Sequence, residues 1–466
     1  MKKRLFSEFP KTSTEDWKKI IEKDLKGNDY YQNLVWKTDE DIDLEPFYRS
    51  EDLEDINYIS EGISPYLNQN KKNNSWKISH EIYANDIKEV NKTAKKMIKN
   101  GVDSLIFNGE FINSYEDLEL LLSDINPEDT QINFKITSEH PELLNCFVNY
   151  ISKNNYDNTK ISGSLFYDHN KSLLLTGFHD EVKNAEYIKY NLETINKASI
   201  NYNILAIHSY PFKSSGANIV QELAYTLSSV IDCLVNLSKN NVSLEEIINK
   251  LIFSFSISSN YFMEIAKLRA AKIIWPQIIE QFTPEIKSIP AMKIHCHSAD
   301  FNKTLFDPHV NLLRSTIETM ASAIGGADSI QVVPFDKYSK TPDDFSDRIA
   351  KNIQLLTKYE SFLDKVVDPA AGSYYIEKLT NSIANEALKL IVEIENLGGF
   401  ISAFNNKHIQ SSIAENKTKI EEKIEKRKQT ILGTNQFPNI EEKIKHSFDE
   451  HKKLDSKGNS ETLKLF

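Results

Sequence analysis

The stretch NILAIHSYPFKSSGANIVQELAYTLSS (203–229) decides the fold, because it joins a strand pattern directly to a helix pattern. The apolar run 204–207 predicts a short buried strand, and the residues after Gly216 predict a long amphipathic helix. Strands that feed helices build parallel α/β folds, in which functional side chains gather where the strands end. Pro211 stands at this strand end, although its side chain can neither donate nor accept a proton.

The same alternation of strand and helix patterns repeats eight times from residue 76 onward, which predicts an α/β fold of the (β/α)8 TIM-barrel type. The fourth unit fits least well, because the apolar residues of 169–185 follow neither the helical nor the strand periodicity. The eight expected strands are 76–84, 104–109, 132–138, 161–168, 203–210, 252–259, 293–299 and 329–335. The expected helices include 86–101, 114–125, 141–153, 186–198, 218–239, 261–282 and 310–326.

Two further segments flank the expected barrel (76–365). Residues 1–75 begin with a capped helix, 12–27, and continue with many turn-forming residues, which predicts an extended interface arm without a core of its own. Residues 366–466 contain two long helical patterns and a polar tail, which predicts a C-terminal helical extension. The chain thus divides into an arm, a barrel and post-barrel helices.

The composition excludes several classes of function. Hydrophobic residues make up 40% and charged residues 26%, an ordinary balance for a soluble globular protein. The net charge of −11 argues against nucleic-acid binding and against adhesion to anionic membranes. We expect a cytoplasmic protein, because the start lacks an apolar signal region and no apolar run is long enough to span a bilayer. The three cysteines, which show no CxxC spacing, favour a reducing compartment: Cys146, Cys233 and Cys296.

One pair of histidines opens an alternative reading. His295 and His297 are two apart on an expected strand, so both point to the same face. With Asp300 and His208 they suggest a zinc site of a metal-dependent barrel hydrolase. The competing reading is a pair of hydrogen-bonded pocket histidines without a metal.

Six sequence blocks carry a family resemblance: IAKLRAAKIIWPQI (265–278), DPHVNLLRSTIETMASAIGGADSIQVVPFD (307–336), VVDPAAGSYYIEKLT (366–380), ILGTNQF (431–437), EDWKKIIEKDLKG (15–27) and DLEPFYRSEDL (43–53). They resemble sequences of the methylmalonyl-CoA mutase family. The resemblance covers most of the chain and implies a (β/α)8 barrel that is threaded by the CoA chain. It also implies adenosylcobalamin-dependent isomerisation of methylmalonyl-CoA and succinyl-CoA.

The positions that carry function in this family are largely changed. Catalytic chains read RPWTIRQYAG at the first strand, where this chain keeps Trp76 but has Ser79 at an arginine position and Glu81 at the substrate tyrosine. They read GYHMQEAGA after the fifth strand, where Pro211 replaces the histidine that contacts the thioester. The degenerate barrel-mouth positions are therefore Trp76, Ser79, Glu81, His208, Tyr210, Pro211, Gly216 and His297.

The resemblance also implies a cobalamin-binding domain with a DxHxxG motif, which we do not find; DEH (449–451) lacks the glycine. We therefore expect no catalytic, cofactor-binding or metal-binding residues on this chain. The implied role is the non-catalytic small subunit of a heterodimer, whose large catalytic subunit binds adenosylcobalamin and substrate. The alternatives are a catalytic chain that uses a separate cobalamin-binding protein, and the metal-dependent hydrolase.

Overall fold

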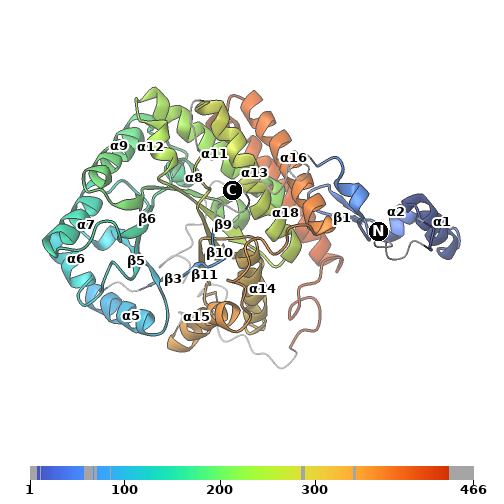
Figure 1. Ribbon diagram of the computed structural model, residues 1–466, viewed down its shortest axis with the longest axis horizontal. Coiled ribbons are helices and arrows are strands. Elements are labelled where there is room, and N and C mark those ends of the chain that lie inside the picture. The colour runs from blue at the N-terminus through green and yellow to red at the C-terminus, as the bar shows by residue number, and fades with distance from the viewer. Residues whose placement is uncertain are drawn as a thin grey trace.

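A computed structural model describes residues 8–10, 12–56, 67, 71–83, 86–284, 289–338 and 343–439. Figure 1 shows a ring of helices around a central sheet, with the first helices extending away from that body. The DEH stretch (449–451) lies outside the described residues.

The central sheet is a parallel barrel in the order β7-β6-β5-β4-β3-β11-β10-β9-β8. β7 and β8 are two halves of one strand: β7 pairs with β6, and β8 pairs with β9. The backbone N–H of Ala206 donates to the carbonyl of Tyr167 at 2.8 Å, which helps close the ring at this split. The prediction of a (β/α)8 barrel is therefore confirmed. The strands are β3 (Lys77–Glu81), β4 (Ser104–Asn108), β5 (Gln131–Lys135), β6 (Ser162–Phe166), β7 (Asn201–Asn203), β8 (Leu205–His208), β9 (Leu251–Ile257), β10 (Ile294–Ser298) and β11 (Ser329–Gln331).

Helices follow the strands around the barrel (Figure 1). The fourth unit differs from its prediction, because α8 and the first turn of α9 occupy part of 169–185. Asp180 caps α9 by accepting the N–H of Lys183 at 3.0 Å, so the helix begins before its apolar period is visible. The elements are α5 (Ile87–Lys99), η2 (Gly109–Phe111), α6 (Tyr115–Leu121), α7 (Pro141–Lys153), α8 (Lys171–Thr176), α9 (Glu181–Lys197), α10 (Tyr210–Ser214), α11 (Ile219–Lys239), α12 (Leu244–Ile248), α13 (Tyr261–Phe282), α14 (Val310–Ile324) and α15 (Asp344–Tyr359).

The N-terminal segment consists of α1 (Thr14–Asp24), α2 (Tyr30–Leu34), the ribbon strands β1 (Trp36–Lys37) and β2 (Asp43–Leu44), and η1 (Ser50–Leu53). A capping box of Ser13 and Asp16 starts α1, which buries none of its residues in this chain. The segment meets the body at α11, where Asn218 Nδ2 donates to the carbonyl of Asp39 at 3.0 Å and the N–H of Ile219 donates to Glu40 Oε1 at 3.2 Å.

We expect Asn218→Ala to lower the free energy of unfolding by about 1–2 kcal/mol. Asn218 caps α11 through the N–H of Gln221 at 2.8 Å, and its amide also holds the carbonyl of Asp39. Urea denaturation measures the loss. Asn352→Ala, at a partly exposed position of α15 away from any helix cap, is the matched control and should stay within about 0.5 kcal/mol of the wild type. An equal effect of the two substitutions would contradict the capping role.

Three helices follow the barrel: α16 (Tyr374–Asn396), α17 (Phe400–Asn405) and α18 (His408–Glu425). α16 packs against α11 and α13. Arg269 of α13 forms buried ion pairs with Asp368 and with Glu377, 2.7 Å from the latter. The AKLRAA and DPAAGSYYIE blocks thus each supply one side of the same buried contact.

Candidate functional site

The carboxyl ends of all the parallel strands meet at one end of the barrel, which is its mouth. There Glu81 of β3 accepts a hydrogen bond from Lys135 Nζ of β5 at 2.9 Å and from Gln331 Nε2 of β11 at 2.9 Å. Tyr83 donates to the same carboxylate at 2.9 Å. Burial alone would raise the pKa of Glu81, but the ammonium groups of Lys135 and Lys337 hold it well below its usual range. Glu81 is therefore a carboxylate anion that links β3 to β5 and to β11 across the mouth.

A second link crosses the mouth between the fifth and eighth units. Asp300, which follows β10, accepts hydrogen bonds from the hydroxyl of Tyr210 at 2.9 Å and from that of Tyr338. Tyr210 begins α10 directly after β8, and Tyr338 follows β11. The aspartate predicted as a metal ligand thus serves as a hydrogen-bond acceptor for two phenols.

The histidine pair belongs to the barrel interior. His295 Nδ1 lies 2.8 Å from Ser329 Oγ, and His297 Nε2 lies 3.3 Å from Ser256 Oγ. Burial lowers the pKa of His295 to about 3 and that of His297 to about 4, so both rings are neutral at physiological pH. Within the ranges that the structure describes, no three His, Cys, Asp or Glu side chains come together as a metal site, so the zinc reading gains no support.

The barrel centre is filled by side chains. Ile106, Phe166, Ala206 and Ile252 form a buried cluster separate from the main core, and each comes from an inward-facing position of a strand. The ring of Phe166 lies 5.1 Å from that of His295 and 5.9 Å from that of His208, measured between centroids. The cluster and the histidines above it therefore occupy the axis of the barrel.

Pro211 lies in the first turn of α10, where a missing N–H costs no helical hydrogen bond. Its carbonyl accepts the hydroxyl of Ser215 at 2.7 Å. Gly216 adopts a positive φ of 106°, and a Cβ there would lie 2.9 Å from Cβ of Lys417 in α18. Asn416 Nδ2 donates to the carbonyl of Gly216 at 2.7 Å. The segment that follows this strand end therefore packs closely against α18.

Two of the predicted mouth positions lie away from the mouth. Trp76 precedes β3, so it stands at the amino end of the strand, where Lys358 Nζ donates to its carbonyl at 2.7 Å. Ser79 faces the interior below Glu81 and donates to Ser104 Oγ at 2.9 Å. A sequence match shows that a residue belongs to a strand. It does not show which end of the barrel that residue occupies.

A buried cluster of charges, which sequence reasoning missed, lies beside the strand ends between α11 and α13. Lys267 Nζ lies 2.8 Å from Glu222 Oε2 and 2.6 Å from Glu264 Oε2, and all three side chains are fully buried. Lys213 of α10 completes it at 3.9 Å from Glu222. The available signal was the pair Glu264 and Lys267, spaced i, i+3 in a part of the helix that is mostly apolar.

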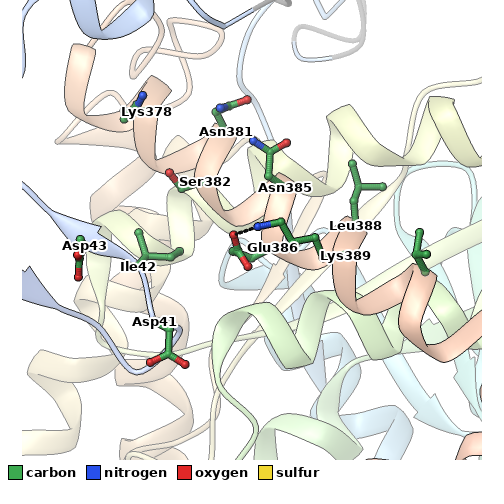
Figure 2. Close-up of a pocket in the computed structure, with 11 residues that line it drawn as sticks. Asp41, Ile42, Asp43, Lys378, Asn381, Ser382, Asn385, Glu386, Leu388 and Lys389 are labelled. Carbon is green, nitrogen blue, oxygen red and sulfur yellow. Dashed lines mark hydrogen bonds and ion pairs between the residues drawn. The ribbon is translucent and has the colours of Figure 1, made fainter.

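A separate groove of about 810 Å³ lies outside the barrel, between the β1–β2 ribbon and α16. Figure 2 shows Asp41, Ile42 and Asp43 on the ribbon side and side chains from successive turns of α16 on the other. We call it the α16 groove. Glu386 and Lys389 pair within it at 2.6 Å (Figure 2).

The fold and the mouth define a TIM-barrel protein whose strand ends are linked to one another across the mouth. The family model described as methylmalonyl-CoA mutase matches residues 106–464. The chain belongs to the methylmalonyl-CoA mutase family, as the sequence blocks predicted.

The relatives cover most of this chain. It is 41% identical over 450 residues to the methylmalonyl-CoA mutase small subunit of Porphyromonas gingivalis, a match that covers 95% of this chain and 72% of that protein. It is 28% identical to the methylmalonyl-CoA mutase of Rhizobium meliloti, over 91% of this chain and 64% of that one. The human mitochondrial methylmalonyl-CoA mutase is 28% identical over 91% of this chain and 60% of its own length. The chain thus spans less than two thirds of those two mutases.

None of the described helices is long and apolar enough to cross a membrane.

Proposed function

We propose that this chain is the non-catalytic small subunit of an adenosylcobalamin-dependent methylmalonyl-CoA mutase, and that it works in the cytoplasm. Its partner is a large catalytic subunit that binds the cofactor and the substrate. The role of the small subunit is to stabilise the large one in a heterodimer. The relative named a small subunit supports the pairing, and the geometry of the barrel supports the absence of catalysis.

The main support for the proposal is that side chains fill the axis of the barrel. An acyl-CoA that threads a barrel needs an open axis, but Ile106, Phe166 and Ile252 occupy it here. At the mouth, the ion pair between Glu81 and Lys135 stands where the resemblance implies a substrate tyrosine. The carboxylate of Glu81 would also repel the carboxylate of methylmalonyl-CoA at short range. Substrate binding would therefore require both unpacking of the axis and disruption of the mouth.

The described residues do not fit adenosylcobalamin. Apart from the barrel, the strands described form only the two-stranded β1–β2 ribbon, so this part of the chain supplies no α/β domain for the corrin. The barrel mouth, which would face the cofactor, is crossed by Asp300 and its two tyrosines. We therefore assign the cofactor to the large subunit and derive no reaction step on this chain.

The exposed arm supplies a surface for the partner. Ile20 of α1, Tyr31 of α2 and Trp36 of β1 are each more than half exposed. Trp17 packs on Phe47, with ring centroids 3.6 Å apart, so the arm has a small contact of its own but leaves its outer side chains uncovered. Apolar side chains gathered on a projecting segment are typical of a subunit interface.

We expect the purified chain, mixed with adenosylcobalamin and methylmalonyl-CoA, to form no succinyl-CoA. Activity should appear when the large subunit is added. Coupled assay of succinyl-CoA measures this, and calorimetry measures binding of methylmalonyl-CoA to the chain alone. Pro211→His should stay inactive, because the filled axis and Glu81 remain. Turnover by the chain without the large subunit, with or without a separate cobalamin-binding protein, would overturn the proposal.

A further inference from the structure

The outward side of α14 is an apolar stripe that the described residues leave open to water. Leu313 and Ile317 are 61% and 39% exposed. Val310 and Met320 are partly exposed and fall on the same side of the helix, at spacings of three and four residues. We call these four residues the α14 face. An apolar stripe on the surface of a helix is typical of a contact surface.

No unpaired charge interrupts the α14 face. From Val310 to Ile324 the helix carries only two charged side chains, Arg314 and Glu318. Glu318 is buried, and Lys303 Nζ lies 2.5 Å from its Oε1. The guanidinium of Arg314 donates to the carbonyl of Leu432 at 2.8 Å, in the loop that follows α18. The face therefore complements a segment with an apolar side rather than a charged one.

The described part of the chain ends beside the first turn of α14. A Cβ at Gly433 would lie 3.6 Å from Cγ2 of Val310, so the loop after α18 lies against the start of the α14 face. The described residues end at Asn439, six residues later, and six residues span at most about 20 Å. Phe437, in this stretch, is 75% exposed. The residues that follow Asn439 therefore begin within reach of the α14 face.

The sequence of 440–466, which lies outside the described residues, contains a helix pattern of matching length. Asn439 with Glu442 three residues later is a pattern that starts helices. Every Asp, Glu and Lys of 440–454 avoids one side of the helix that this pattern predicts. At 1.5 Å per residue this stretch would be about 22 Å long, like α14, which also has 15 residues. The apolar residues share the uncharged side: Ile440, Ile444, Phe448 and Leu454.

We propose that residues 440–454 form an amphipathic helix that packs along the α14 face of the same chain. The two stripes match in length and in apolar character, and packing removes both from water. A helix of this length is marginal alone in water, so it needs such a surface in order to form. A segment tethered beside its site acts at an effective concentration of about a millimolar, which favours it over a free partner of similar chemistry. The inference concerns this chain alone and does not rest on the proposed function.

Hydrogen–deuterium exchange of the full-length chain without any partner, read by mass spectrometry of its peptides, tests the proposal. We expect the amides of 440–454 to exchange at least about tenfold more slowly than those of an unstructured chain. The double variant Leu313→Asp, Ile317→Asp should remove this protection, because it places two carboxylates against the apolar side of the helix. Both positions lie on the surface, and thermal melting checks that the barrel is intact.

Reciprocal and control variants show which surface is used. Ile444→Asp with Phe448→Asp should remove the protection from the other partner of the contact. His446→Asp, on the opposite side of the expected helix, should keep it. Val182→Asp is the control for the barrel, because Val182 is an exposed apolar residue of α9, far from α14 in the ring (Figure 1), and it should also keep the protection.

Three results would overturn the proposal. The first is free exchange of 440–454 in the wild-type chain. The second is protection that survives Leu313→Asp with Ile317→Asp in a folded chain. The third is protection that disappears on dilution while sedimentation shows a dimer, which would assign the α14 face to a second copy. None of these results bears on the pairing with a large subunit, which the activity assay tests separately.

Discussion

Lys267→Met is expected to lower the free energy of unfolding by about 3–5 kcal/mol. The ammonium of Lys267 lies between the carboxylates of Glu222 and Glu264 and also donates to the carbonyl of Ser256 at 2.7 Å. Without it, two buried carboxylates share only the more distant Lys213. Burial already raises the pKa of Glu222, and loss of the neighbouring cation would raise it further, so one carboxyl must take up a proton on folding. Urea denaturation at pH 7 measures the loss.

A double substitution keeps this test informative if the single variant folds poorly. Lys267→Met with Glu222→Gln removes one charge of each sign, so it should be more stable than Lys267→Met alone. Lys389→Met is the matched control, because that lysine pairs with Glu386 on the surface of α16 and should change stability by less than about 1 kcal/mol. A loss below about 1 kcal/mol for Lys267→Met would show that the cluster is not the closed, buried unit described here.

Acidification is expected to unfold the protein steeply below pH 6. Burial lowers the pKa of His169 and His295 to about 3, and that of His80 and His297 to about 4. The unfolded chain takes up protons near pH 6.5, so below that pH it binds more protons than the folded chain. The contribution of these histidines to stability is therefore fully present above pH 6.5. Below that pH, the free energy of unfolding falls by about 1.4 kcal/mol per pH unit for each ring. Asp347 opposes this between pH 6 and 4, because burial raises its pKa to about 6.

The four rings less the opposing Asp347 leave a net effect equal to three groups, which is about 4 kcal/mol per pH unit near pH 5. This is a large part of the total stability of an ordinary domain. Urea denaturation at pH values from 7 to 4.5 gives the slope. His295→Asn should make the slope shallower by about one ring, because it removes one of the four buried neutral imidazoles. A free energy of unfolding that stays constant from pH 7 to 5 would contradict the neutral, buried state of these histidines.

The sequence predicted which residues lie at the barrel mouth better than it predicted which residues they contact. Glu81 and Pro211 were identified from single positions in aligned blocks, and both lie at the strand ends of the barrel. The same motif predicts Trp76 at the mouth, but Trp76 lies at the opposite end of the barrel, because the motif contains both ends of one strand. The partners of Glu81 were not predicted. Lys135 is 54 residues away and Gln331 is 250 residues away, and neither distance leaves a local pattern.

The sequence by itself determined the barrel and the family, because the barrel is written in local periods and the family in short motifs. Only the tertiary structure decided that Ile106, Phe166, Ala206 and Ile252 fill the axis and that Glu81 and Asp300 bridge the mouth. The physical reason is that strand register and closure of the ring set which inward-facing side chains meet. Pro211 lies in the first turn of α10, at a barrel mouth that is crossed by the hydrogen bonds of Glu81 and Asp300.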